Sequence, residues 1–238
     1  YVTPRMLTGP GGLMRMSTGH HRLMQWVAVF VFASLASWVA ARLNSGVAIL
    51  VYEAAAQTAK APEAHFRITD PADLSGERAE SIYSAIKMSM RKHYVESGGP
   101  IAFNYADWKR YNRVPYRFSQ YGNNYLNNYA NETARDYGKY ESAGEMPAGA
   151  LLAKDSFIVT RNGDIITGPF FLMEKMPEGW NPATGDWRYV EYTASGELTG
   201  ITKGIRANKV RYCATCHARV GKKWDYMFFM PKDVRVVE

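Results

Sequence analysis

The residues best suited to chemistry stand together near the C-terminus, where the chain reads Cys213-Ala214-Thr215-Cys216-His217. C-x-x-C-H is the attachment signal of a c-type haem: the two thiols bond the porphyrin, and the histidine lies under the iron. A disulfide or half of a zinc site is the alternative, but zinc needs four ligands, and the chain has only two cysteines. The sequence therefore predicts one covalent haem c, with Cys213 and Cys216 as attachment residues and His217 as the proximal iron ligand.

The motif does not determine the ligand on the far side of the iron. A haem with two strong protein ligands transfers electrons, whereas one with an open position binds or activates a small molecule. We favour Met176 as a distal ligand, because the turn that begins at Pro177 frees it from the alternation of a strand. Other candidates are Met173, Met227, Met230 and His93, although methionine more often fills a core and such a histidine is more often a core residue.

A haem of this kind is attached outside the cytoplasm, so the chain needs a segment that carries the motif across a membrane. Residues 23–41 contain no charged side chain and approach the roughly 20 residues that a membrane-spanning helix needs. We expect one anchor helix over residues 23–56, embedded in the lipid bilayer and extending beyond it. A cleavable signal peptide is the alternative, but its apolar core would be shorter.

The charges before this stretch predict its orientation. Arg5, Arg15 and Arg22 precede it and no acidic residue does, so residues 1–22 are expected in the cytoplasm. The chain would then cross the cytoplasmic (inner) membrane once and place its C-terminal part in the periplasm. This is the side that haem attachment requires.

Composition and periodicity predict a folded periplasmic domain over residues 71–238, after a polar linker at 57–70. Hydrophobic residues make up 47% of the chain, which argues against disorder. A helix is expected after Asp70-Pro71, because apolar residues recur at three- and four-residue spacing up to His93. Tyr121, Tyr125 and Tyr129 are four apart, which predicts a second helix over about 123–140.

After Pro147 the apolar pattern becomes that of strands. Residues 150–159 are strand-like, and Asn162-Gly163 is a hairpin signal. Further strands are expected at residues 170–173, 187–192 and 198–202. Hairpin-connected strands with helices before and after them predict an α+β fold with an antiparallel sheet.

Four features follow one another along the chain: Lys154-Asp155 in a strand, G-D-W-R-Y from Gly185 to Tyr189, the late C-x-x-C-H, and Asp225-Tyr226-Met227-Phe228-Phe229 after it. This order resembles the cytochrome P-460 family, which includes the cytochromes c′-beta. It implies an antiparallel sheet with flanking helices, a homodimer, a histidine-ligated haem and frequently an open distal face. One branch of the family oxidises hydroxylamine and cross-links a lysine to the haem edge, and the other binds gases such as nitric oxide. Lys154 occupies the matching lysine position, although an ion-paired or exposed strand lysine is the alternative.

Three functions fit these features. We favour an electron-transfer or accessory subunit of a membrane energy-transducing complex, because tethering beside a redox partner raises the effective concentration. A hydroxylamine- or nitric-oxide-directed enzyme or gas-binding protein and a structural subunit with a non-catalytic haem are the alternatives. The Gly- and Pro-rich tail at residues 8–12 would need a partner surface to be ordered.

The net charge of +7 favours acidic partners or anionic membranes, and no nucleic-acid motif accompanies it. Cations gather around the haem motif, where they could dock an acidic redox partner or simply form a solvated surface. They are Lys203, Arg206, Lys209, Arg211, Arg219, Lys222 and Lys223.

Overall fold

The computed structural model describes residues 63–69, 74–96, 104–118 and 124–237. The chain divides into two compact units, residues 1–59 and 60–238, and the described residues belong to the second. The tail predicted at 1–22 and the anchor predicted at 23–56 lie outside the described residues. Within the described ranges no helix combines the length and apolarity that crossing a bilayer would take.

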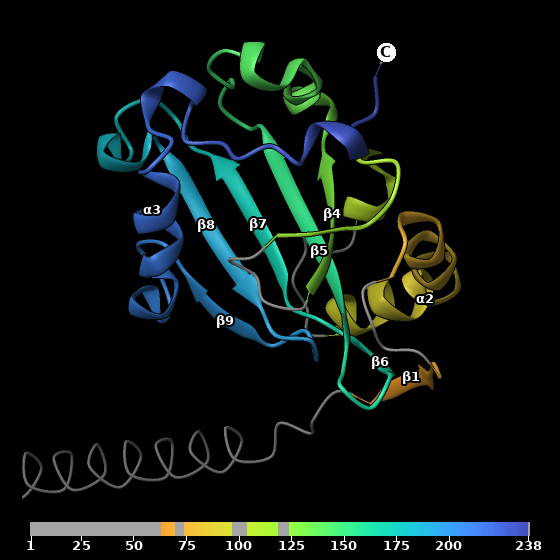
Figure 1. Ribbon diagram of the computed structural model, residues 1–238. Coiled ribbons are helices and arrows are strands. Elements are labelled where there is room, and N and C mark those ends of the chain that lie inside the picture. The colour runs from red at the N-terminus through yellow and green to blue at the C-terminus, as the bar shows by residue number, and fades with distance from the viewer. Residues whose placement is uncertain (1–62, 70–73, 97–103, 119–123, 238) are drawn as a thin grey trace, which may run out of the picture. The chain divides into compact units, whose positions relative to one another are not determined.

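An antiparallel sheet forms the centre of this unit (Figure 1). Its longest strand, β5 (Leu151–Val159), pairs on one side with β4 (Asn124–Ala130) and on the other with β6 (Asp164–Thr167) and β7 (Phe170–Lys175). Next to β7 lie β8 (Trp187–Tyr192) and then β9 (Leu198–Ile201). The short strands β1 (Ala64–Arg67), β2 (Lys109–Arg110) and β3 (Tyr116–Arg117) pair with β6, β4 and β4 respectively.

The predicted hairpin at Asn162-Gly163 is confirmed. Thr160 and Asp164 close it through a backbone hydrogen bond of 2.9 Å, and Gly163 has a left-handed φ of 84°. A β-carbon on Gly163 would lie 2.1 Å from the carbonyl oxygen of Ile68. Glycine is therefore required here both by the backbone conformation and by the close approach of the preceding segment.

Alternation along the strands divides the buried side chains between the two faces of the sheet. Tyr125, Tyr129 and Phe157 belong to one core cluster, whereas Leu126 and Leu152 belong to a second. The sheet therefore has two buried faces, and each must be covered by other elements.

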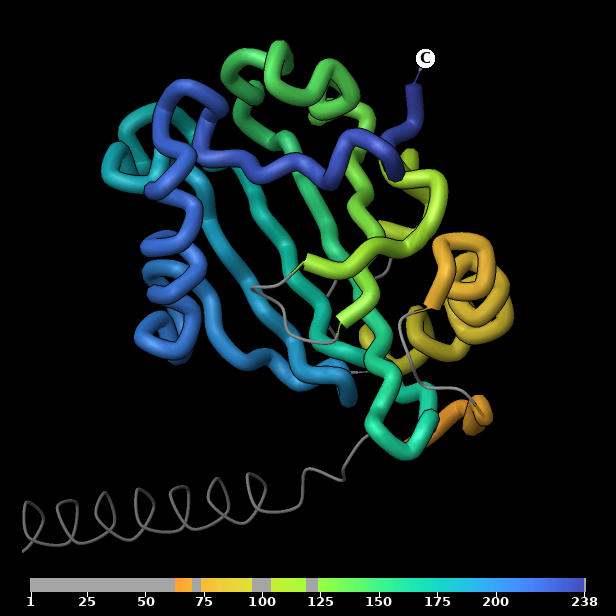
Figure 2. Tube along the Cα trace, viewed as in Figure 1, coloured from red at the N-terminus to blue at the C-terminus, as the bar shows by residue number. Residues whose placement is uncertain are grey.

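Helix α2 (Gly76–Glu96) covers the first face, as the spacing of its apolar residues predicted. Ala79, Ile82, Ile86 and Met90 are buried in the first cluster. On the second face lie helix α3 (Arg211–His217), the 3-10 helix η3 (Glu132–Ser142) and the segment at 224–230. Figure 2 shows α2 and α3 well separated, with the strands of the sheet between them.

The α+β class and the antiparallel sheet are confirmed, but two local predictions are wrong. Residues 124–130 of the helix predicted over 123–140 form β4, and only the later part is helical, as η3. A four-residue tyrosine spacing also fits a strand, because residues an even number apart share one face of it. The predicted linker at 57–70 contains β1, which pairs with β6.

Candidate functional site

The C-x-x-C-H motif lies on α3, a helix of seven residues. Three- and four-residue spacing places Cys213, Cys216 and His217 on one side of a helix. The helix ends at Ala218, whose N–H donates to the carbonyl oxygens of Ala214 and Cys216. Both cysteines are half-buried free thiols, so no disulfide joins them.

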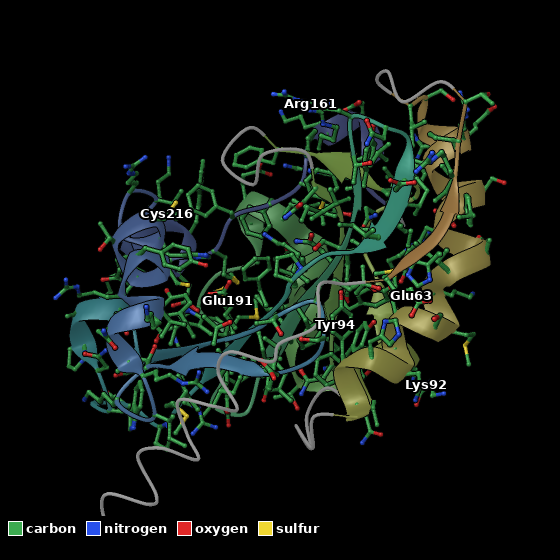
Figure 3. The ribbon with its side chains drawn as sticks, turned by 90° about the horizontal axis from the view of Figure 1, so that it is seen from below. Glu63, Lys92, Tyr94, Arg161, Glu191 and Cys216 are labelled. Atoms are coloured by element: carbon green, nitrogen blue, oxygen red, sulfur yellow. The ribbon has the colours of Figure 1, made fainter. Side chains whose placement is uncertain are left out.

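A cavity of about 320 Å³ lies between α3 and the second face of the sheet. Cys213, Cys216 and His217 all line it, together with the segment that contains Met227 and Phe228. The sheet contributes Leu152 and Lys154 of β5, Phe171 and Met173 of β7, and Tyr189 of β8. Residues of the motif pack in the second core cluster and Tyr94 of α2 in the first, so the motif and α2 occupy different sides of the sheet. Figure 3 labels Cys216 on α3, well apart from Tyr94.

His217 is buried, with 7% of its surface exposed, and its ring packs against the rings of Tyr189 and Phe228. Its Nδ1 lies 2.5 Å from the carbonyl oxygen of Tyr226. Because a carbonyl can only accept, Nδ1 carries the proton and Nε2 keeps a lone pair for a metal. Burial lowers the pKa of His217 to about 4; the Tyr226 hydrogen bond opposes this, and the charge of Lys154 adds to it. The imidazole is therefore neutral at pH 7, which is the form that binds metals.

Tyr226, whose carbonyl accepts from His217, comes directly after Asp225, and Asp225 forms a buried ion pair with Lys175. The Oδ1 atom of Asp225 lies 2.7 Å from Nζ of Lys175, and both side chains are 5% exposed. Oδ2 of Asp225 accepts from the Met146 N–H at 2.9 Å, and its carbonyl accepts from Nε1 of Trp187 at 2.7 Å. Asp225 and Tyr226 have left-handed φ values of 45° and 57°. Residues with a β-carbon rarely adopt this conformation, so the contacts around Asp225 hold a strained turn.

Lys154 lies at the centre of the sheet side of the cavity. Its cross-strand neighbours are Asn128 on β4 and Phe171 on β7, and all three residues line the cavity. Its charge is near enough to lower the pKa of His217. The structure therefore brings together the predicted proximal ligand and the lysine that the family resemblance singled out.

A hydrogen-bonded network fixes the wall beside Lys154. Asn128 accepts from the hydroxyl of Tyr116 and donates to the hydroxyl of Tyr137, each at 2.8 Å. Tyr137 in turn donates to the carbonyl oxygen of Phe228 at 2.9 Å. This network connects β4 and η3 to the same C-terminal segment that contacts His217.

Met176 is not among the residues that line the cavity. Alternation along β7 directs Met173 to the cavity side and Leu172 to the α2 side. Met176 comes directly after the strand and is an even number of residues from Leu172, so the same alternation would direct it to the α2 side. The position of Met176 thus does not support our prediction of a distal ligand. Within the described lining, the methionines are Met173 and Met227.

His93 lies away from the cavity. Its Nδ1 is 3.3 Å from Oγ1 of Thr167, and its ring stacks on that of His65 at 5.9 Å. Thr167 is fully buried and also lies 2.9 Å from Nε2 of His65. His93 is therefore a hydrogen-bonded residue of the α2 side, which was the alternative to ligation.

Three features of the cavity fit a covalently attached haem. Two free thiols and the unprotonated Nε2 of His217 belong to one side of the same helix. The hydroxyl of Tyr189 is buried and has no hydrogen-bond partner within the described ranges. Leaving such a group unpaired costs about 1–3 kcal/mol, and a bound group in the cavity can relieve this cost.

The cations predicted around the motif are all exposed, and we call them the basic surface: Lys203, Arg206, Lys209, Arg211, Arg219, Lys222 and Lys223. Residues 198–224 contain no aspartate or glutamate. The ion pairs found among the described residues involve none of these cations. One carboxylate, that of Glu191, contacts α3 by accepting from the hydroxyl of Tyr212 at 3.0 Å.

Fold and site together define a protein built to hold a c-type haem: an α+β domain with two thiols and a neutral imidazole on one cavity. Residues 103–229 match the family described as cytochrome P460. The match covers more than half of the chain, and the chain belongs to the cytochrome P460 family. None of the curated proteins compared matches the chain. Since the family binds a c-type haem covalently, this chain is a c-type haem protein.

The sequence did not reveal the roles of several residues of the site. Tyr189 and Asp225 stood inside the motifs that carried the resemblance, but their contacts depend on long-range packing. Lys175 and Asn128 gave no signal of their own, because a lysine at the end of a strand and an asparagine within one are both common. A cross-strand register would have revealed Asn128, since it pairs with Lys154.

Proposed function

We propose that this chain is a membrane-anchored monohaem cytochrome that exchanges electrons with a partner protein. In this proposal Cys213 and Cys216 form the thioether bonds and His217 is the proximal iron ligand. The observation that carries it is that both thiols and a neutral, hydrogen-bonded imidazole line one cavity. When bound, the haem iron supplies one-electron exchange and a sixth coordination position.

The polar groups of the cavity favour electron exchange over chemistry that removes protons. Among the described residues that line it there is no carboxylate, and His217 is the one histidine. Oxidation of hydroxylamine releases protons, which a base close to the substrate must accept. A simple electron carrier has no such requirement, so the lining suits it better.

The basic surface supports an acidic redox partner. Its cations lie on the helix that carries both attachment cysteines or flank that helix in the sequence, so a protein docked there would lie close to that side of the cavity. Complementary charge steers such encounters and raises the association rate. The partner in this proposal is another subunit of a membrane energy-transducing complex, with an acidic surface beside its own redox centre.

The proposal places residues 23–56 in the lipid bilayer of the cytoplasmic membrane and the haem domain in the periplasm. The uncharged run at 23–41 and the preceding arginines support this orientation. Protease added to spheroplasts should digest the haem domain, whereas inverted membrane vesicles should protect it. Protection in spheroplasts would refute the orientation.

A second function is favoured by one specific observation, the position of Lys154 in the cavity wall. A lysine there suits an enzyme of the family type that acts on hydroxylamine or nitric oxide, with Lys154 cross-linked to the haem edge. The adjoining Phe171 and Met173 give the cavity apolar surface, which suits a small uncharged ligand.

Absorption spectra of the full-length holoprotein separate the two functions. We expect the reduced spectrum to stay unchanged under carbon monoxide, because a protein ligand fills the sixth position of an electron carrier. A shift under carbon monoxide would refute this and favour the second function. A red-shifted reduced Soret band that disappears in Lys154→Met, but persists in the control Lys92→Met on α2, would show the cross-link. Lys92 is exposed and lies on the α2 side of the sheet (Figure 3).

A further inference from the structure

We propose that Lys175 and Asp225 form a clamp that sets how strongly His217 donates to the iron, and thereby the reduction potential. This inference rests on the proposed role of His217 as the proximal ligand. Neither is among the described residues that line the cavity, and the contacts found for the imidazole within the described ranges are with Tyr189, Phe228 and the carbonyl of Tyr226. Both act through the carbonyl group of Tyr226, so they are positioning residues.

Asp225 is held from three separate segments. Lys175, the last residue of β7, contacts Oδ1; the N–H of Met146 contacts Oδ2; and the indole of Trp187, the first residue of β8, contacts the carbonyl oxygen. Lys175 also pairs with Trp187 across the two strands, and its Nζ lies 5.4 Å from the centre of the indole ring. The sheet itself thus fixes Asp225 in position.

The position of Asp225 determines the position of the acceptor for His217. Asp225 and Tyr226 are consecutive left-handed residues, a conformation that costs of order 1–3 kcal/mol each and persists only where surrounding contacts impose it. The next carbonyl group, that of Tyr226, is the one that accepts from Nδ1 of His217. Relaxing the turn at Asp225 would therefore move or weaken this acceptor.

The strength of the hydrogen bond from His217 to the Tyr226 carbonyl changes the basicity of the imidazole as an iron ligand. A hydrogen bond from the second ring nitrogen fixes the orientation of a metal-bound histidine and raises its basicity. A more basic imidazole favours the more highly charged oxidised iron over the reduced iron. The clamp is therefore expected to hold the reduction potential lower than an unclamped histidine would.

A buried ion pair needs a reason beyond stability. Removing two charges from water costs several kcal/mol per ion, and an apolar pair of similar volume is often as stable. Lys175 and Asp225 are each 5% exposed, and the nearby Glu145, 3.4 Å from Nζ of Lys175, is 73% exposed. Apolar replacements could fill this space, but they could not hold Asp225 by its carboxylate.

The test compares three variants of the full-length holoprotein. Lys175→Met removes the clamp, Lys175→Gln keeps a neutral donor, and Arg188→Met is the matched control. Arg188 pairs with Glu174 across the same two strands, and no contact joins either residue to Asp225. The readouts are the reduction potential and the iron–histidine stretching frequency of the reduced protein. The frequency is recorded by nuclear resonance vibrational spectroscopy on isotopically enriched iron, which detects this bond whether or not a sixth ligand is present.

We expect the potential of Lys175→Met to rise by about 59 mV, which is a tenfold change in a one-electron equilibrium. The stretching frequency should fall, because the imidazole becomes less basic. Lys175→Gln should show a smaller change in the same directions, and Arg188→Met should match the parent. Simple loss of a buried cation would instead lower the potential, so the sign separates the clamp from a charge effect.

An unchanged stretching frequency in a folded Lys175 variant would overturn the clamp, whatever the potential does. Should Lys175→Met fail to accumulate as holoprotein, Lys175→Gln decides the question by the same criterion. If the parent itself shows no iron–histidine vibration, the proposed ligation by His217 is wrong. A parent vibration that is the same in all variants leaves the ligation intact and refutes the clamp alone.

Discussion

Asp155 should make the stability of this protein depend on pH in a direction opposite to that of an ordinary surface carboxylate. It follows Lys154 on β5 but lies on the other side of the sheet, fully buried. Its oxygens accept from the hydroxyls of Tyr83 and Tyr105 and from the amide of Asn127, at 2.7, 3.0 and 3.0 Å. Burial raises the pKa of Asp155 from 3.8 to about 6, although these hydrogen bonds oppose the rise.

The size of the effect follows from this pKa. A rise from 3.8 to about 6 corresponds to about 3 kcal/mol between the two protonation states. Because the folded pKa lies above the unfolded one, the contribution is fully present below about pH 4 and is lost as the pH rises through about 6. The free energy of unfolding should therefore fall by about 3 kcal/mol across this window through Asp155 alone.

Asp155→Asn isolates this contribution. The variant will be less stable than the parent at every pH, because its amide nitrogen replaces an oxygen that accepts a hydrogen bond. Its free energy of unfolding should not show the fall with pH that the titration of Asp155 causes in the parent. Urea unfolding at several pH values between 4 and 7 should show the parent losing about 2–3 kcal/mol more than the variant across the range. Asp164→Asn, which removes a carboxylate paired at the surface with Arg67, is the control and should keep the fall in stability that Asp155 causes between pH 4 and 7. Parallel curves for the parent and Asp155→Asn would refute the reasoning.

Three further predictions concern the docking surface, the cavity and the core. Replacing Lys222 and Lys223 together by glutamate should slow electron exchange with an acidic redox protein at low salt, and the difference from the parent should shrink in high salt. Equal rates for parent and variant in stopped-flow measurements would exclude the basic surface as the docking site. Tyr137→Phe removes the hydrogen bonds that the hydroxyl donates to the Phe228 carbonyl and accepts from Asn128, and should lower the free energy of unfolding in urea by about 1–3 kcal/mol; no change would show that both bonds are dispensable. Leu172→Ala should cost about 2–5 kcal/mol, since Leu172 is 2% exposed, and a loss under 1 kcal/mol would contradict its place in the core.

The sequence predicts those parts of the molecule whose physical causes are local. The hairpin at Asn162-Gly163 follows from a backbone conformation that glycine allows, and α2 follows from the spacing of its apolar residues. The predicted haem residues likewise belong to one short motif, so α3 carries them on one side without help from distant residues. Each of these features is determined by neighbours within a few positions.

The rest depends on pairings that the sequence does not show. The tyrosines before and within β4 fit both a helix and a strand, and only pairing with β5 decides between them. The position of Met176 depends on the register of β7, which assigns its neighbours to the two faces of the sheet. The acceptor for His217 is nine residues away and depends on two left-handed residues that Lys175 helps to hold.

The mass of the denatured full-length protein tests the central claim most directly, when it is expressed in a host that attaches c-type haem. We predict that the parent carries the added mass of one haem and that this mass is lost when Cys213 and Cys216 are both replaced by alanine. His217→Ala leaves both cysteines in place, so it should keep the added mass of one haem. It should lose the absorption spectrum of the histidine-ligated parent. A parent polypeptide without the added mass, or a double cysteine variant that retains it, would contradict the account.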